Sequence, residues 1–286
     1  MATIPIQWEG SDTERKPSAS VWGRCPWNAI VEGSVNGAWI WDDFSSFNKT
    51  PATTEGNWAA SRGYAQFSST GGFITAPAIT AATTSGVGQT GIVIGSDDDN
   101  EGVGIRTLST PFVINRATQK LWFECRLKKS TIANTTFELF AGFMEDTALT
   151  AVIPITTTAA TLADKNLFGF YSTESAGANA SVSYKCDGVT QVNVSTTEVT
   201  FVADTYTKLG IKYELTGDKD GQYILSFYQD GVRLATSKQV PTAAGTDFPN
   251  DIAMGLVLAT RNAAGSSPGN ATVSWWRAAQ LYAPLN

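Results

Sequence analysis

Histidine is absent from this sequence of 286 residues. Without an imidazole, the chain has no Ser-His-Asp or Cys-His nucleophile pair and no histidine-containing metal site. Cysteine is scarce too: Cys25, Cys125 and Cys186 are the three present, and no C-x-x-C spacing occurs. An odd number of cysteines without that spacing argues against a structural zinc site. We expect Cys125 and Cys186 to be small buried side chains of strands.

Charged residues are also few. They make up 16% of the chain, against about 25% in typical soluble domains. The net charge is -6 and no run of Lys or Arg exceeds two residues, so no basic stripe could follow a phosphate backbone. We therefore expect no nucleic-acid partner. A surface with so few long charged side chains suits a protein whose faces are covered by copies or partners.

Long apolar runs are missing as well. No run approaches the ~18 residues that a membrane-spanning helix needs. Residues 1–16 do not place a basic segment before an apolar one, which is the pattern of a secretory signal. We expect no membrane partner and synthesis in the cytoplasm, with any outside location reached by another route.

The pattern that is present is alternation of apolar and polar residues, while helical periodicity is nearly absent. Residues 206–215 alternate apolar side chains with lysines and a glutamate, as a strand with one buried face does. The pair Asp230-Gly231 lies between two such segments and predicts a β-hairpin, and Asp187-Gly188 repeats the signal. Further strands are predicted in TFELFAGFM, LFGFYSTE, DIAMGLVLATR and ATVSWWRAAQLY.

About ten or more short strands with turn signals between them predict an all-β fold, one antiparallel β-sandwich or jelly roll. Stretches rich in Thr and Ala, such as residues 74–90 and 151–166, interrupt the strands without a change of character on either side. We interpret them as long loops of one sandwich and not as boundaries between domains.

The first 35 residues differ from the rest. They hold Trp8, Trp22 and Trp27 and show no periodicity. We therefore predict an extended, irregular N-terminal arm over residues 1–35 and a sandwich domain over residues 36–286. Two interpretations of the tryptophans stay open: the arm folds back onto its own sandwich, or the tryptophans anchor it to a neighbouring subunit.

The central and C-terminal strands resemble the concanavalin A-like jelly roll, the sandwich of laminin-G domains and legume lectins. The resemblance rests on KLGIKYELTGDKDGQYILSFYQDGVRLATSKQV, residues 208–240, where a strand, a loop and a strand ending in FYQDGVRLA match that family's hairpin. With WIWDDF, LWFECRLKKS, FELFAGFMEDTA and the closing SWWRAAQLYAP, the chain also resembles virion structural proteins of tailed bacteriophages. This second resemblance covers roughly residues 36–286.

The phage resemblance implies a virion structural protein that is not an enzyme: a capsid decoration or cement protein, or a head-fibre component. Its implied partners are the major capsid protein and copies of itself, in a homo-oligomer for which a trimer is favoured. Its implied location is the capsid surface, after assembly in the host cytoplasm. In this interpretation Trp8, Trp22 and Trp27 are the candidate subunit or capsid contacts.

The alternative is a glycan-binding, lectin-like module that attaches to a host surface. Aromatic side chains on an exposed face of a sandwich can stack on sugar rings, and Trp275, Trp276 or Tyr228 are the candidates. Neighbouring residues of a strand point to opposite faces, so core packing accounts for one of Trp275 and Trp276.

The stretch IGSDDDNEGVG raises the question of catalysis. Asp97, Asp99 and Glu101 alternate, and an E-x-D-x-E strand in some concanavalin A-like glycosidases holds two catalytic carboxylates about 5 Å apart. Gly95 and Gly102 bracket the run, and Asp, Asn and Gly disfavour strands, which favours a solvated turn. We assign no catalytic residue, cofactor or metal ligand. Whether the three carboxylates bind a cation such as Ca²⁺ stays open.

Overall fold

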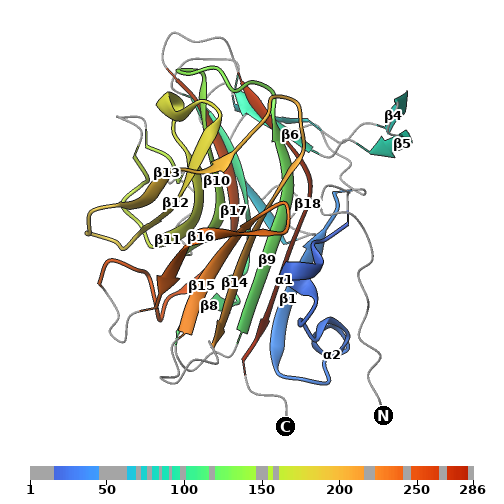
Figure 1. Cartoon of the computed structure of the whole chain (residues 1–286), viewed down its shortest axis with the longest axis vertical. Coiled ribbons are helices and arrows are strands. Elements are labelled where there is room, and N and C mark those ends of the chain that lie inside the picture. Colours follow the sequence, from blue (N-terminus) through green and yellow to red (C-terminus); the bar gives the residue numbers. More distant parts are fainter. Residues whose placement is uncertain are drawn as a thin grey trace.

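The computed structural model describes residues 16–44, 63–68, 72–75, 79–83, 86–89, 92–96, 101–115, 120–145, 154–156, 161–215, 223–240, 246–263 and 269–282. In these ranges the chain forms two eight-stranded antiparallel sheets, which pack face to face (Figure 1). The predicted all-β antiparallel sandwich is therefore confirmed. Of the helices in the described ranges, none has the length and apolar character to cross a membrane.

Sheet A contains, in spatial order, β16 (Val232–Gln239), β15 (Tyr223–Gln229), β14 (Thr207–Leu215), β9 (Lys120–Lys129), β18 (Asn270–Leu281), β6 (Ile92–Ser96) and β3 (Gly72–Thr75), with β1 (Gly37–Asp42) also paired to β18. Sheet B contains β13 (Val192–Thr200), β12 (Asn179–Lys185), β11 (Leu167–Ser172), β10 (Phe137–Glu145), β17 (Ala253–Asn262), β7 (Gly102–Thr107) and β2 (Tyr64–Ser68), with β8 (Phe112–Val113) paired to β17.

The smaller elements lie outside the two sheets. Strands β4 (Ile79–Thr83) and β5 (Gly86–Gln89) pair with each other as a separate hairpin, inside a stretch that the sequence predicts as loop. Two short helices, α1 (Ala19–Trp22) and α2 (Trp27–Val31), precede β1, and a 3₁₀ turn, η2 (Glu174–Ala176), follows β11.

The core lies between the sheets because the long strands alternate as predicted. In β14, Leu209, Ile211 and Tyr213 are buried in the core. Lys208 and Lys212, which alternate with them, face away from it. Cys125 of β9 occupies the same core and is fully buried, which confirms the sequence interpretation.

The predicted hairpin at Asp230-Gly231 is present between β15 and β16. Asp230 has a φ of 49° and Gly231 a φ of 80°, and two consecutive positive φ angles are what a tight type I′ turn requires. An Asp-Gly pair meets this requirement at low cost, because glycine has no Cβ and aspartate tolerates the left-handed region.

The outer face of sheet B is covered by the chain itself. Ile155 and Leu162 form a β-bridge to each other and pack with apolar residues of β10, β11 and β17 into a second cluster of buried side chains. They belong to the stretch 151–166, which the sequence predicts as a loop. Because this segment buries the apolar side chains beneath it, that part of sheet B offers no open apolar surface.

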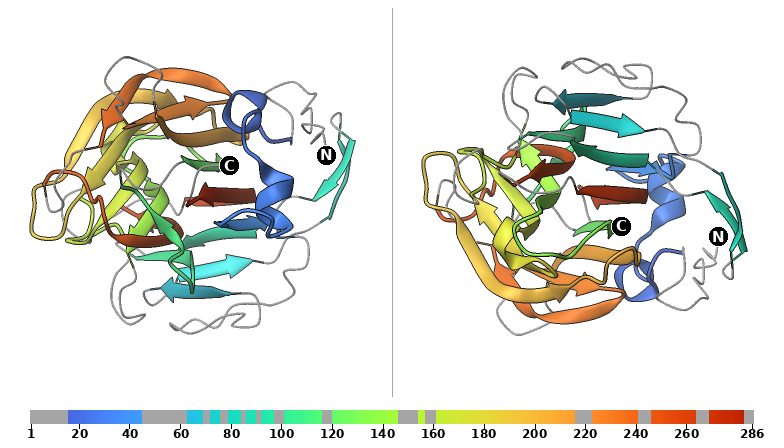
Figure 2. Two further views of the ribbon diagram at one scale, coloured as in Figure 1. Left: turned by 90° about the horizontal axis from the view of Figure 1, so that it is seen from below. Right: turned by 90° about the horizontal axis from the view of Figure 1, so that it is seen from above.

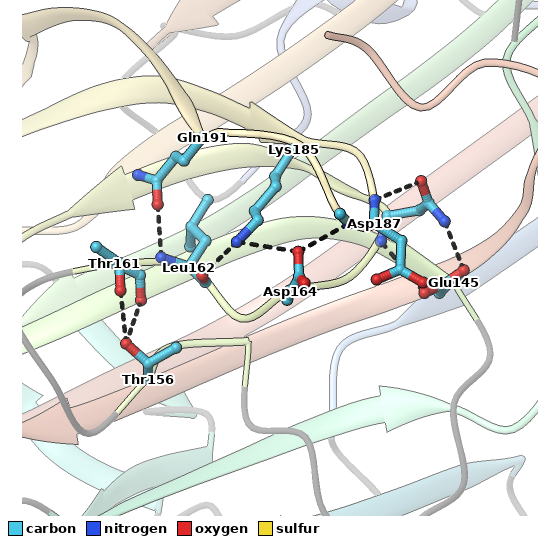
Figure 3. A network of polar contacts seen from close by, with 10 residues as sticks. Glu145, Thr156, Thr161, Leu162, Asp164, Lys185, Asp187 and Gln191 are labelled. Atoms are coloured by element: carbon cyan, nitrogen blue, oxygen red, sulfur yellow. Dashed lines mark hydrogen bonds and ion pairs between the residues drawn. The ribbon is translucent and has the colours of Figure 1, made fainter. Parts of the chain in front are cut away.

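A network of polar contacts holds the same segment against the turn between β12 and β13 (Figure 3). The Leu162 N–H donates to Gln191 Oε1 at 2.6 Å. Lys185 Nζ lies 3.3 Å from Asp164 Oδ1, which also accepts a hydrogen bond from the Gly188 N–H at 2.9 Å. These contacts satisfy backbone donors that neither sheet pairs, so the covering segment has a defined position.

A buried ion pair also lies on this side of sheet B. Glu138 Oε2 of β10 is 3.4 Å from Arg261 Nη1 of β17, and both side chains are almost completely buried. Burial raises the pKa of the Glu138 carboxyl to about 7 although Arg261 opposes that shift. The charged form of this carboxyl therefore destabilises the folded protein relative to the protonated form.

This shift predicts a pH dependence of stability. The folded-state pKa of Glu138, about 7, lies above the ordinary value of 4.5, so the folded chain binds the proton more tightly than the unfolded chain. The contribution is complete below pH 4.5 and is lost as the pH rises through 7. We expect Glu138→Gln to remove up to about 3 kcal/mol of the pH-dependent change in unfolding free energy, measured by urea unfolding across this range. An identical pH profile in the variant would contradict the assignment.

Candidate functional site

The N-terminal residues 17–35 fold back onto the outer face of sheet A, where both short helices lie (Figure 2). Val21, Trp22 and Ile30 are buried there, in a cluster with residues of β9, β15 and β18. For residues 17–35 the structure thus has the first of the two open interpretations, in which the arm folds back onto its own sandwich. It differs from the predicted irregular segment in forming two short helices. Helices of four and five residues leave no sustained periodicity in a sequence, because they complete little more than one turn.

The three candidate contact tryptophans have different positions. Trp22 is 1% exposed, and its indole N–H donates to Glu124 Oε2 at 2.9 Å, so it packs within its own chain. Trp27 is half-buried and meets the Trp22 ring edge-on, with ring centroids 5.6 Å apart. Trp8 lies outside the described residues. Of the described two, Trp27 alone offers surface to another molecule.

The exposed aromatic side chains of this face come from β1. Trp39 is 44% and Trp41 is 51% exposed, while Ala38 and Ile40, which alternate with them, pack against the core. The Trp27 ring touches both exposed indoles edge-on, at centroid distances of 5.9 and 6.2 Å. The sequence signal for this surface is the W-x-W alternation in WIWDDF, since residues two apart in a strand share a face.

An open pocket of about 160 Å³ lies beside Trp41. Trp41 and Asp43 line it from β1 and the residue after it, Trp275 and Arg277 from β18, and Pro17 from the N-terminal arm. The antiparallel pairing of β1 with β18 puts Trp41 directly opposite Arg277. Three segments that are far apart in the sequence therefore meet at one pocket.

Arg277 is the cation of this pocket. It is 2% exposed, and its guanidinium lies 4.2 Å from the Trp41 ring centroid and 4.9 Å from that of Trp27. Burial lowers the pKa of Arg277 to about 10, and Glu124 opposes the shift, so the group is charged at neutral pH. A charged guanidinium stacked on indoles is held in place and presents its N–H groups in a fixed plane.

The described lining residues of the pocket offer groups that can bind a polar molecule. Asp43 is the one carboxylate among the lining residues that the structure describes, whereas glycoside hydrolysis needs a pair of carboxyl groups across the scissile bond. Within the described parts of the chain, no three cysteine or acidic side chains gather in a way that could hold a metal ion. An exposed indole, a guanidinium and a carboxylate around a small open volume can hold a polar molecule with one flat apolar face.

The stacking candidates chosen from the sequence need a correction. Trp275, Trp276 and Tyr228 are all buried, at 4%, 1% and 6% exposure. As predicted, one of the adjacent tryptophans faces the core: Trp276 packs there, and its indole N–H donates to the Tyr64 hydroxyl at 3.3 Å. Trp275 contributes only an edge of the pocket, and Tyr228 is covered by the N-terminal helices.

The acidic residues and cysteines singled out in the sequence have separate outcomes. Asp97 and Asp99 are outside the described residues, and Glu101 directly precedes β7, so cation binding by the three stays a hypothesis. Cys186 is buried immediately after β12, as expected. Cys25 is half-buried among the N-terminal helices, and burial raises the pKa of its thiol to about 12, which disfavours the reactive thiolate.

No family model matches the chain, and no curated protein is similar to it in sequence. Among solved structures, it is similar to a protein of unknown function from Shewanella oneidensis MR-1, with a TM-score of 0.49, 13% identity and coverage of 88% of this chain and 90% of the other. An endo-1,3-beta-glucanase from Streptomyces sioyaensis gives a TM-score of 0.47, 12% identity and 87% and 97% coverage. The carbohydrate recognition domain of Emp47p gives a TM-score of 0.45 and 10% identity, with coverage of 72% of this chain and 87% of the other.

These similarities concern the fold. The described residues form an antiparallel two-sheet sandwich, and the more specific concanavalin A-like resemblance of residues 208–240 stays a prediction. At such low identity, what the similar proteins bind or cleave does not transfer to this chain.

The different positions of the tryptophans predict different effects on stability. We expect Trp22→Ala to lower the unfolding free energy by about 3–5 kcal/mol, because it removes a fully buried indole and leaves a cavity. Trp41→Ala should change it by no more than about 1 kcal/mol, because half of that side chain is in solvent. Urea unfolding followed by circular dichroism measures both, and similar losses for the two variants would contradict the described docking of the arm.

Proposed function

We propose that this protein is a glycan-binding module that takes one sugar ring into the pocket beside Trp41. The observation that carries the proposal is the combination of a half-exposed indole with an open pocket that also contains Arg277 and Asp43. A sugar ring has an apolar C–H face, which packs on an indole, and hydroxyl groups, which a carboxylate and a guanidinium hydrogen-bond.

The size of the pocket supports a single ring as the bound unit. Pockets for drug-sized ligands typically enclose about 300–1,000 Å³, whereas this one holds about 160 Å³. The pocket is also open to solvent, so the rest of an oligosaccharide could extend outward from the bound ring. Recognition of a terminal or protruding sugar of a longer glycan fits this shape.

The charges around the pocket favour an uncharged sugar. Within the described ranges, Arg277 is the one cationic residue that lines it, and Asp43 lines the same pocket. Glu124 lies directly opposite Arg277 in the pairing of β9 with β18. The neighbouring carboxyl groups offset the guanidinium charge, so an anionic sugar gains little there.

A glycan array followed by calorimetry tests this proposal. We expect binding to neutral glycans, and we expect Trp41→Ala to weaken it by about tenfold or more, because the stacking surface is lost. Trp39→Ala is the matched control: it removes an exposed indole from the same face of the same strand, but Trp39 does not line the pocket. Equal losses in both variants, or no binding to any neutral glycan, would rule out the pocket as the site.

The second candidate is the virion structural protein implied by the phage resemblance, on a capsid surface with the major capsid protein and copies of itself as partners. What favours it is an apolar surface on one outer face: Trp39, Trp41 and Val31, all more than a third exposed, are close together near β1 and α2. A partner that covers this surface would bury it.

Immunogold electron microscopy of purified phage particles tests the second candidate. A capsid decoration protein should give regular label over the heads, because decoration follows the symmetry of the shell. Label confined to tail tips would instead support glycan binding in host attachment. Particles without label would exclude the virion role.

A further inference from the structure

One wall of the pocket beside Trp41 comes from the N-terminal arm, through Pro17. The next residue, Ser18, is fully buried, and its backbone N–H donates to Glu124 Oε2 at 2.9 Å. The same oxygen accepts the indole N–H of Trp22, also at 2.9 Å. Glu124 itself is 1% exposed in the middle of β9. One buried carboxylate therefore binds the arm at both ends of the segment 18–22.

The sheet is also shaped to receive the arm. Gly210 of β14 lies opposite Glu124 in the strand pairing. A Cβ at Gly210 would come within 2.9 Å of Val21 Cγ2 and 3.3 Å of Tyr228 Cβ, which is closer than side chains pack. The missing side chain leaves the space that Val21 fills. Gly210 has an ordinary strand backbone, so its conformation does not require glycine. Glycine is needed there because the arm approaches the sheet closely.

Two further contacts fix the arm beyond this point. Lys208 Nζ donates to the carbonyl oxygen of Lys16 at 3.1 Å. The Ser20 hydroxyl donates to the carbonyl oxygen of Gly231, in the turn between β15 and β16. The arm is therefore held by β9, β14 and the β15–β16 hairpin, all of which belong to sheet A.

The docked arm reaches the pocket by a second path, through rings. Trp22 packs against Trp27, and Trp27 against Trp41, with centroid distances of 5.6 and 6.2 Å. The Arg277 guanidinium lies within 5.4 Å of the centroids of all three rings. If the arm left the sheet, the pocket would lose the Pro17 wall and the indoles of Trp22 and Trp27 that hold Arg277 and Trp41 in position.

We propose that Glu124 is the positioning residue of this pocket: it holds the arm on sheet A, and the pocket binds a sugar only when the arm is docked. This inference rests on the proposed glycan binding. Arm docking and sugar binding are then coupled, and the coupling is reciprocal. The apparent affinity equals the affinity of the docked form reduced by the fraction of molecules in that form.

Two variants that act on the arm in different ways test the coupling. Glu124→Gln keeps the shape of the side chain and removes the charge that binds two donors. Gly210→Val fills the space of Val21: the nearest side chains to its Cβ are those of Val21 and Tyr228, and neither lines the pocket. Glu138→Gln is the matched control, because it neutralises an equally buried carboxyl on the other sheet.

The readouts are hydrogen–deuterium exchange of the backbone amides of residues 18–22 and binding of glucose, galactose, mannose and N-acetylglucosamine, followed by tryptophan fluorescence. We expect both arm variants to bring exchange of these amides close to the rate of an undocked segment. Binding of the sugar that the wild-type protein prefers should then weaken about tenfold or more, by the factor by which the docked fraction falls. The control should change neither. In the wild-type protein, that sugar should slow exchange of the same amides, a result that needs no variant.

The outcomes separate this inference from the proposed function. If the wild-type protein binds a sugar and both arm variants bind it equally well although their arm amides exchange at close to the rate of an undocked segment, the coupling is wrong and glycan binding stands. A sugar that binds without slowing exchange in the wild-type arm would also overturn the coupling. If the wild-type protein binds none of the four sugars, the proposed function itself fails and this inference with it.

Discussion

The pairing of β9 with β18 in the centre of sheet A is the contact on which the rest of the structure depends. Its register puts Cys125 opposite Trp276 on the core side and Glu124 opposite Arg277 on the outer side. A shift by one residue would exchange the two faces, moving the charged pair into the core and the indole into solvent. The same register thus determines both the packing of the core and the position of Arg277, which lines the pocket.

The two outer faces are covered in different ways, and this difference locates the site. On sheet B, Ile155 and Leu162 seal an apolar cluster, and a polar network holds the covering segment in place. On sheet A, the N-terminal helices cover the middle strands but leave the exposed indoles of Trp39 and Trp41 at β1. A pocket remains where the cover ends, and its position there explains why the arm supplies one wall.

The chemistry available at the pocket agrees with what the composition excludes. A chain without histidine has no imidazole to act as a general base, and among the residues placed by the structure Asp43 is the single carboxylate that lines the pocket. The described lining residues and their neighbours offer an indole for stacking, a guanidinium beside aromatic rings and a carboxylate for hydrogen bonds. These groups can bind a ligand only when they are correctly placed. The positions of the segments that carry them therefore matter more than the pKa of any one side chain.

Alternation by itself determined which side chains of β14 enter the core, and the Asp230-Gly231 pair determined the hairpin, because both depend on neighbours in the sequence. It also required one of Trp275 and Trp276 to face inward. The sequence alone does not show that Trp22 is buried and Trp41 is half exposed. Alternation puts Trp41 on the outer face of β1 but does not show which segment covers that face, and Trp22 lies in a helix too short to show a pattern. Which outer-face residues are covered depends on contacts such as that of Ser18 with Glu124, 106 residues apart in the chain. Only the folded sheets bring such residues together.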